Sequence, residues 1–248
     1  MTVLVVTGTG TEIGKTVTTA AVAALAVRAG RSVAVLKPAQ TGVAPGEPGD
    51  VDEVLRLAGD AVTPLELARF PEPLAPGTAA ARAGLEPVRP AQVAEAAEKL
   101  AASHDLVLVE GAGGLLVHFD GQGATLADAA RLLGAPVLVV AQAGLGTLNS
   151  VQLTAEALRA RGLDQAGVVI GSWPHEPGLA ERCNVADLPC VAGAPLVGAV
   201  PQGAGGLDPA AFRARAGGWL GPGLGGTWDG AEFAGAVRPP EYGGAARP

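Results

Sequence analysis

The chain has 248 residues, of which 48% are hydrophobic and only 3% aromatic, so its core must be built from Ala, Val and Leu. That length allows one large α/β domain or two small ones. The net charge of −7 argues against a nonspecific binder of nucleic acid or of an anionic membrane. Anionic ligands must then be held by local lysines and backbone dipoles.

Signals for targeting and for disulfide bonds are sparse. No apolar run reaches about 18 residues without Gly, Pro or charge, so no membrane span is expected. The sequence opens directly on a strand-like run, which predicts a cytoplasmic protein without a signal peptide. Cys183 and Cys190 match neither a CxxC motif nor a disulfide scaffold, so two reduced thiols are expected rather than a bridge.

Strand-like and helical patterns alternate along the chain. The strand-like runs are Val3–Val6, Ser32–Leu36, Leu106–Val109, Pro136–Ala141, Gly167–Ile170 and Leu196–Val200. Most are continuously apolar, as in parallel strands that are buried on both faces. The helical patterns are Val17–Arg28, Val51–Leu57, Ala91–Ala102, Leu126–Leu133 and Leu148–Arg161. The alternation predicts a single-domain, doubly wound, mostly parallel α/β sheet with right-handed crossovers.

Several helix ends can be read from the sequence. Pro90 stands where a first helical residue would, and Gly30 and Gly162 fit just past helix ends. Thr125 with Asp128 three residues later resembles a capping box. Asp208-Pro209 is expected to open a last helix that runs to about Gly217.

Two stretches fall outside this alternation. The Pro-rich stretch Phe70–Pro90 predicts a long excursion off the sheet, and long loops in compact domains are often functional. From Gly221 the chain is rich in Gly, Pro and Ala, so Gly221–Pro248 is expected to be a poorly ordered tail. The predicted domain therefore spans residues 1–220.

The first strand–helix junction reads as a phosphate loop, Gly8-Thr9-Gly10-Thr11-Glu12-Ile13-Gly14-Lys15-Thr16. Glycines let backbone N–H groups approach phosphate oxygens, and the helix N-terminus adds partial positive charge. Lys15 is placed to reach the β- and γ-phosphates, and the Thr16 hydroxyl to bind Mg²⁺. The strict pattern puts its first glycine where this chain has Thr9. The alternative is an ordinary Gly-rich turn.

Polar residues follow the next two strands. Lys37 ends the second strand and is followed by Thr41; since ligands bind at the carboxyl ends of strands, Lys37 should face the phosphate loop. Asp50 and Asp52 start a helix, where the helix dipole favours acidic side chains, and either is also a candidate metal ligand. Glu110 ends the third strand, a position typical of a carboxylate that holds Mg²⁺ beside a nucleoside triphosphate. For Lys37 and Glu110 the alternative is a solvated strand end.

A second glycine loop, Gly144–Asn149, opens a helix and is a candidate anion site built from backbone N–H groups, or else a plain turn. His104, His118 and His175 have no spacing that suggests a zinc site. No Ser/His/Asp or Cys/His arrangement can be argued from the sequence.

Taken together, these motifs resemble the dethiobiotin synthetase family, ATP-dependent ligases of the P-loop NTPase fold. The resemblance rests on Thr7–Thr16, Lys37-Pro38-Ala39-Gln40-Thr41-Gly42, Val109–Gly114 and Gly146–Asn149, whose order and spacing match over roughly residues 2–220. The glycine at Gly8, rather than one residue later, is the family's own form.

The resemblance implies a cyclo-ligase reaction. One amine of 7,8-diaminononanoate takes up CO₂ as a carbamate, which attacks the γ-phosphate of ATP or another nucleoside triphosphate. The second amine then closes on the mixed anhydride and releases phosphate. The family works as a homodimer with the diamine across the interface.

The resemblance also implies which residues take part. Lys37, Lys15 and Thr11 would be catalytic, and Thr16, Asp50 and Glu110 would hold Mg²⁺. The nucleotide would contact Gly10, Thr11, Glu12, Ile13, Gly14, Lys15, Thr16, Val17, Glu110, Gly111, Gly113, Gly171, Ser172, Pro201, Gln202 and Gly203. The diamine would contact Thr41, Lys37, Gly146, Thr147, Leu148 and Asn149, the last four from the neighbouring subunit.

One departure concerns the base. Many family members carry an Asn after the fifth strand that reads adenine, whereas this chain has Gly171-Ser172. Backbone groups at Pro201–Gly203 remain available to the base, and loose selectivity among triphosphates is expected.

The sequence argues against two other functions of proteins that share this fold. A cobyrinate amidotransferase shares this synthetase fold but adds a glutaminase domain with a nucleophilic Cys, for which 248 residues leave no room. A partitioning-type switch ATPase usually carries an extra lysine near the start of its loop, where this chain has Thr9 and Gly10.

Overall fold

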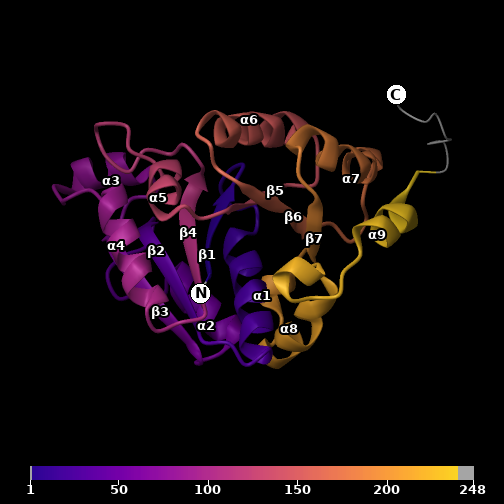
Figure 1. Cartoon of the computed structure of the whole chain (residues 1–248), viewed down its shortest axis with the longest axis horizontal. Helices are drawn as coiled ribbons and strands as arrows, with labels where there is room; N and C mark the ends of the chain where they lie inside the picture. Colours follow the sequence, from indigo (N-terminus) through magenta and orange to yellow (C-terminus); the bar gives the residue numbers. More distant parts are fainter. Residues whose placement is uncertain (1, 240–248) are drawn as a thin grey trace.

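The computed structural model describes residues 2–239, which form one seven-stranded sheet in the order β3-β2-β4-β1-β5-β6-β7 (Figure 1). Every strand pair is parallel. The strands are β1 (Thr2–Gly8), β2 (Val33–Thr41), β3 (Val62–Phe70), β4 (Leu106–Gly114), β5 (Val137–Ala141), β6 (Gln165–Trp173) and β7 (Leu196–Pro201). The predicted doubly wound parallel α/β fold is confirmed.

Helices cover both faces of the sheet, so successive strand residues point into two different cores. In β1, for example, Leu4 belongs to one core and Val5 to the other. Figure 1 shows α6 and α7 on one side of the sheet and α1 and α8 on the other. The α-helices are α1 (Lys15–Arg28), α2 (Asp50–Ala58), α3 (Pro76–Ala83), α4 (Pro90–Ala101), α5 (Leu126–Leu133), α6 (Thr147–Ala160), α7 (Leu179–Ala192), α8 (Pro209–Arg215) and α9 (Gly230–Val237).

The topology places a crevice beside β1. The chain builds β2–β4 on one side of β1 and β5–β7 on the other, and ligands bind at such a switch point. Pairing between β2 and β4 stops at Leu36 and Val109, one residue before Lys37 and Glu110. Pro38 follows directly and has no N–H to continue the ladder. The two strands therefore part where the two predicted site residues stand.

The strands run further than the sequence predicted. Lys37 and Glu110 lie inside β2 and β4, which continue to Thr41 and Gly114, and do not end them. The difference arises because apolar runs mark only the part of a strand that is buried on both faces.

The Pro-rich stretch Phe70–Pro90 is not wholly an excursion off the sheet. Its first residue ends β3, and α3 occupies its middle. β3 escaped prediction because it is the edge strand, with Pro64 and charged residues between its apolar ones, so it lacks a continuous apolar run.

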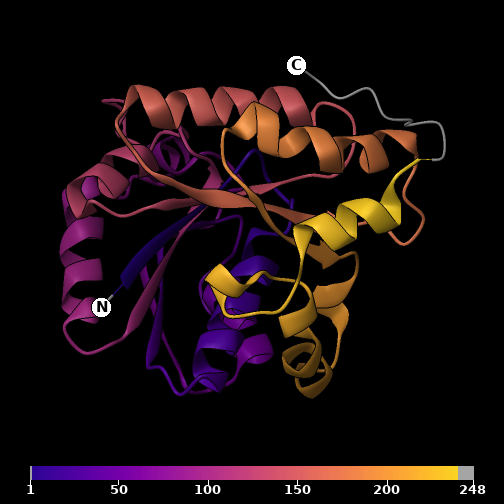
Figure 2. The ribbon, with the colours of Figure 1, turned by 45° about the vertical axis from the view of Figure 1, so that its right-hand side comes forward.

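The expected poorly ordered tail is wrong for residues 221–239, which contain a short 3₁₀ turn and α9. The ring of Phe233 in α9 contacts Trp173 at 5.1 Å and Trp228 at 5.3 Å between centroids. Arg182 of α7 donates to the Val237 carbonyl at 2.8 Å, and Figure 2 shows α9 beside α7. The remaining tail residues, 240–248, lie outside the described part of the chain.

The predicted helix ends are largely confirmed. Pro90 is the first residue of α4, and Thr125 and Asp128 form the capping box of α5, joined from the Thr125 amide at 2.9 Å. The helix opened by Pro209 ends at Arg215 and is followed by a 3₁₀ turn. Both cysteines are free thiols on α7. Within residues 2–239, no helix combines the length and the apolar character needed to cross a membrane.

Candidate active site

The predicted phosphate loop joins β1 to α1 and is pressed against the end of β6. Gly14 has φ 93°, and a Cβ there would lie 2.1 Å from the Gly171 carbonyl oxygen. A Cβ on Gly171 would in turn lie 2.0 Å from the Ile13 carbonyl oxygen. Both glycines are thus required for this close approach, which fixes the loop. Glu12 is the one described non-glycine residue with positive φ, 57°.

The Lys15 ammonium donates to the Gly10 carbonyl at 2.7 Å across this loop and is 7% exposed. Thr11 and Glu12 are exposed at the loop's outer rim. Thr11 lies near Gly113, since a Cβ built there would be 3.6 Å from its hydroxyl oxygen.

Four side chains from different elements converge beside the loop, and we call them the lysine–carboxylate cluster: Thr16, Lys37, Asp50 and Glu110. Lys37 Nζ donates to Glu110 Oε1 at 2.9 Å and to the Gly111 carbonyl at 3.2 Å, and it pairs with Asp50 Oδ2. Thr16 Oγ1 donates to the same Glu110 Oε1 at 2.9 Å. Lys37 is 2% exposed and Glu110 1%, so the solvated strand ends weighed above are wrong for both.

The pKa values of the two lysines are shifted in opposite directions. Burial lowers the pKa of Lys15 below its ordinary value, and the ammonium of Lys37 lowers it further. Burial also acts to lower the pKa of Lys37, but the carboxylates of Glu110 and Asp50 outweigh it and raise that pKa. Lys37 is therefore a firmly charged cation inside the protein.

The cluster suits a hard cation such as Mg²⁺. Glu110 Oε2 is buried and has no hydrogen-bond partner, so one carboxylate oxygen is left for a ligand. Residues 2–239 contain no group of three His, Cys, Asp or Glu able to hold a metal alone. Mg²⁺ bound with a nucleotide needs fewer, because phosphate oxygens and water complete its six positions. The oxygens of Thr16, Asp50 and Glu110 fit that role.

The structure separates the two candidate aspartates. Asp50 faces Lys37, whereas Asp52 accepts from the Gly49 amide at 2.7 Å as the capping side chain of α2. Asp52 therefore serves the helix and Asp50 the cluster.

The residues expected near the base lie side by side at the ends of β6 and β7. Trp173 pairs with Pro201, and the Gln202 amide donates to the Trp173 carbonyl at 2.7 Å. The turn after Gly203 then lies over the start of α1, where a Cβ on Gly205 would be 3.0 Å from Val17 Cγ2. Ser172 is half-buried beside them.

The second glycine loop lies at the start of α6, and among the described residues no hydrogen bond or ion pair joins Gly146–Asn149 to the lysine–carboxylate cluster. Thr147 is fully buried and its hydroxyl is unpartnered, Leu148 packs on the core, and Asn149 is exposed. Only backbone groups and Asn149 are open to a ligand here.

Sequence reasoning missed two buried amides that support these loops. Asn184 of α7 donates to the carbonyls of Ala143 and Gly144, at 2.8 and 3.1 Å. Gln40 of β2 accepts from the backbone amide of Asp50 at 2.9 Å. Gln40 stands inside a recognised motif, whereas nothing in the sequence of α7 singles out Asn184.

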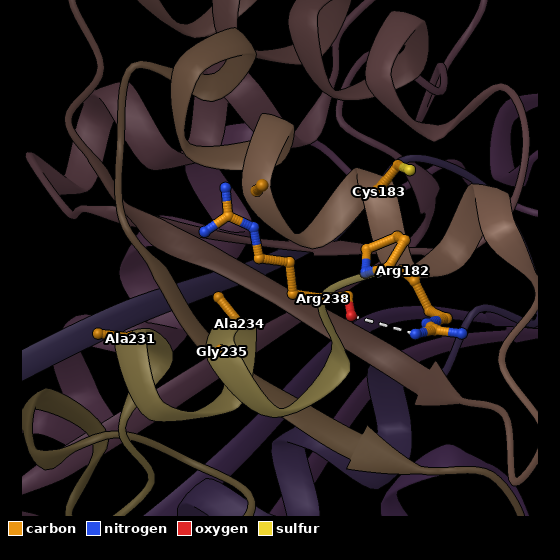
Figure 3. Close-up of a pocket in the computed structure, with 8 residues that line it drawn as sticks. Arg182, Cys183, Ala231, Ala234, Gly235 and Arg238 are labelled. Atoms are coloured by element: carbon orange, nitrogen blue, oxygen red, sulfur yellow. Dashed lines mark hydrogen bonds between the residues drawn. The ribbon is translucent and has the colours of Figure 1, made fainter. Parts of the chain in front are cut away.

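A hollow of about 360 Å³ lies between α7 and α9 (Figure 3). None of its lining residues belongs to the phosphate loop or the lysine–carboxylate cluster. Figure 3 shows Arg182 donating to the Arg238 carbonyl at its edge, a bond of 3.1 Å. The hollow ends at Pro239, the last described residue, and we assign it no part in the site.

Comparison with known proteins gives a strong likeness in sequence and a weaker likeness in structure. Residues 2–205 match the family described as AAA domain. The ATP-dependent dethiobiotin synthetase BioD of Streptomyces avermitilis is 74% identical over 94% of this chain and 98% of that protein. That of Streptomyces coelicolor is 70% identical over the same shares.

Among solved structures, MinD cell division protein from Aquifex aeolicus is similar with a TM-score of 0.53 and 15% identity, covering 87% of each chain. A ParA family ATPase from Chlorobium tepidum is similar with a TM-score of 0.55 and 12% identity, covering 86% of this chain and 89% of that one. At such identities these two likenesses show the fold alone.

Proposed function

The chain belongs to the family of ATP-dependent dethiobiotin synthetases, and we propose that it forms dethiobiotin from 7,8-diaminononanoate and CO₂ in biotin biosynthesis. The observation that carries the proposal is Lys37, buried between Glu110 and Asp50 beside a phosphate loop. A fixed ammonium at that position meets the needs of phosphoryl transfer, which depends on positioning and charge neutralisation. We place the enzyme in the cytoplasm, acting on small molecules rather than on nucleic acid or membranes.

In the proposed reaction, the carbamate oxygen attacks the γ-phosphorus and the bond from that phosphorus to the bridging oxygen breaks, which releases ADP. The free amine then attacks the carbonyl carbon of the carbamoyl phosphate and loses a proton, and phosphate leaves as the ring closes. Lys15 holds the β- and γ-phosphates from the phosphate loop. Lys37 faces the transferring group from the opposite side, and Thr11 and Thr41 line the space between.

Mg²⁺ supplies charge neutralisation at the phosphates when bound. Its protein ligands would be Thr16, Asp50 and Glu110, a choice supported by the free Oε2 of Glu110 and by the capping role of Asp52. Lys37, which pairs with Asp50 and with Glu110 Oε1, holds these carboxylates beside the phosphate loop and presents its ammonium to the phosphoryl group.

The nucleotide lies along the phosphate loop with its base between Gly171-Ser172 and Pro201–Gly203. The adjacency of these segments beside the start of α1 supports this placement.

The working unit is a homodimer in which residues Gly146–Asn149 of the second glycine loop bind the carboxylate of a diamine held by the other subunit. Exposed apolar residues beside that loop support an interface there. Leu145 is 83% exposed, and Leu153, one helical turn beyond Asn149, is 59% exposed.

The decisive experiment is incubation with diaminononanoate, bicarbonate, Mg²⁺ and ATP, with dethiobiotin read by mass and phosphate read in parallel. Phosphate release should require both the diamine and bicarbonate and should match dethiobiotin one to one. Hydrolysis at an equal rate without the diamine would instead indicate a nucleotide switch.

A further inference from the structure

Gln40 is a buried polar side chain that the proposed reaction does not use. It lies in β2 between Ala39 and Thr41 and is 4% exposed. A buried carboxamide costs stability unless its donors and acceptor are satisfied, so its partners show what the side chain does.

Both ends of the carboxamide are bound to backbone, one to the start of α2 and the other to the next residue of β2. Oε1 accepts from the amide of Asp50 at 2.9 Å, and Nε2 donates to the carbonyl of Thr41 at 3.3 Å. Asp50 is the first residue of α2, and the residue before it, Gly49, has no side chain with which to cap the helix. Gln40 thus satisfies a free amide of the first turn from the neighbouring strand.

The contact between Gln40 and the start of α2 is close, and Arg69 holds the same loop from another side. A Cβ on Gly49 would lie 2.9 Å from Gln40 Oε1 and 3.0 Å from an Arg69 guanidinium nitrogen, so glycine allows α2 to approach β2. Arg69 also donates to the Ala44 carbonyl at 3.4 Å and to the Glu47 carbonyl. The loop between β2 and α2 is therefore tied down at its middle by Arg69 and at its end by Gln40.

We propose that Gln40 is a positioning residue: it holds the first turn of α2 against β2 and so aims the Asp50 carboxylate at Lys37 and at nucleotide-bound Mg²⁺. The proposal rests on the metal role of Asp50 in the proposed function. Gln40 itself touches neither phosphate nor metal. Its loss should act only through Asp50.

The test is calorimetry of ATP binding, with and without Mg²⁺, on the full chain as wild type, Gln40→Met, Asp50→Asn and the double variant. Gln40→Met should reduce the gain in ATP affinity that Mg²⁺ provides by about fivefold to tenfold, as expected for one lost hydrogen bond. Affinity without Mg²⁺ should stay within about twofold, because the phosphate loop is untouched. The double variant should lose no more than Asp50→Asn alone.

Gln92→Met is the matched control, because Gln92 accepts from the Arg89 amide at 2.9 Å at the start of α4, remote from the cluster. It likewise removes a glutamine oxygen that accepts from a helix N-terminal amide, and it should leave the Mg²⁺-dependent gain unchanged. If Gln40→Met does not fold, Gln40→Glu keeps the acceptor for Asp50 and should keep most of the gain.

Additive losses in the double variant, or equal losses with and without Mg²⁺, would overturn the positioning role. A wild-type ATP affinity that does not depend on Mg²⁺ would also overturn the positioning role. Failure to form dethiobiotin would overturn only the proposed reaction, since the binding cycle is read without the diamine.

Discussion

Two glycine loops in this molecule share one backbone device but differ in what surrounds it. Each ends in a left-handed glycine, Gly14 with φ 93° and Gly146 with φ 89°, and each opens a helix of 14 residues without a side-chain cap. At both helix starts, free amides and the helix dipole favour an anion.

Their surroundings are unlike. The phosphate loop lies on Gly171 of β6 and faces Lys15 and Lys37, which are both buried. The loop before α6 has no Lys or Arg within residues 142–153 and presents Leu145 to solvent. Since a helix dipole alone contributes about 0.3–1 kcal/mol, the second loop is an incomplete site within one chain. One chain supplies both buried lysines beside the phosphate loop, whereas the second loop would need groups from outside this chain to bind a carboxylate, as in the proposed homodimer.

The largest effect is expected from Lys37→Ala, which removes the buried cation that distinguishes the phosphate site. Turnover should fall by about 10²-fold or more, as for loss of a positioned electrostatic donor. The control is Lys99→Ala, because Lys99 pairs with Glu95 on the surface and should be dispensable. A Lys37→Ala enzyme with near-normal turnover would remove Lys37 from the mechanism.

The same variant should also lose stability, because Lys37 lies buried inside β2 rather than at a solvated strand end. Without Lys37, the buried Glu110 carboxylate has no cation, and an unpaired buried charge costs about 3–5 kcal/mol. Mg²⁺ without nucleotide should then raise the melting temperature of Lys37→Ala more than that of the wild type. The measurement is thermal denaturation with and without Mg²⁺. Equal shifts in melting temperature for the two proteins would show that Lys37 and the metal do not share these carboxylates.

Gly171→Ala tests the contact between β6 and the phosphate loop, and the second glycine loop serves for comparison. The new Cβ would meet backbone, 2.0 Å from the Ile13 carbonyl oxygen, so the loop must shift and overpacking should cost about 1–3 kcal/mol. Nucleotide affinity should fall with it. Gly144→Ala is the matched change in the second loop, where the Cβ would meet only the end of the Glu181 side chain at 3.1 Å. Equal effects of the two variants on ATP binding would mean that β6 does not fix the phosphate loop.

Asn149→Ala tests the incomplete site. The KM for the diamine should rise by about tenfold, as for one lost hydrogen bond to a charged group, while nucleotide affinity stays unchanged. Light scattering at assay concentration should show a dimer. An active monomer would refute the shared site.

These contrasts also show what could be read from the sequence. The phosphate loop, Lys37, Glu110 and the parallel sheet were predicted, because glycine spacing and apolar runs are local signals. β3 was missed because an edge strand need not be continuously apolar. α9 was missed because a segment rich in Gly and Ala gives no clear helical pattern, although aromatic contacts stabilise a helix there. The residues alone left Asp50 and Asp52 open and the resemblance implied Asp50. The physical reason why Asp50 faces Lys37 lies in Gln40 and a capping bond, which only the fold brings together.

The smallest expected effect concerns the base, where Gly171-Ser172 stands in place of the Asn that the family resemblance leads one to expect. Gly171 is engaged with the phosphate loop, and Ser172 supplies a hydroxyl rather than an amide. The Gln202 backbone amide is already bound to the Trp173 carbonyl, so it cannot serve the base without breaking that bond. Few fixed groups are therefore left to discriminate one base from another.

Binding should then rest on the triphosphate and Mg²⁺. A buried amide that reads adenine would reject other bases by about 1–3 kcal/mol for each partner left unpaired. Without it, CTP or GTP should support dethiobiotin formation within about tenfold of ATP in competition assays at matched Mg²⁺, a difference of about 1.4 kcal/mol. A preference for ATP of a hundredfold or more would show that another group reads the base. The exposed Gln202 side chain would then be the amide to remove first, because Gln202 directly follows β7 and its backbone is bonded to Trp173, the residue after Ser172.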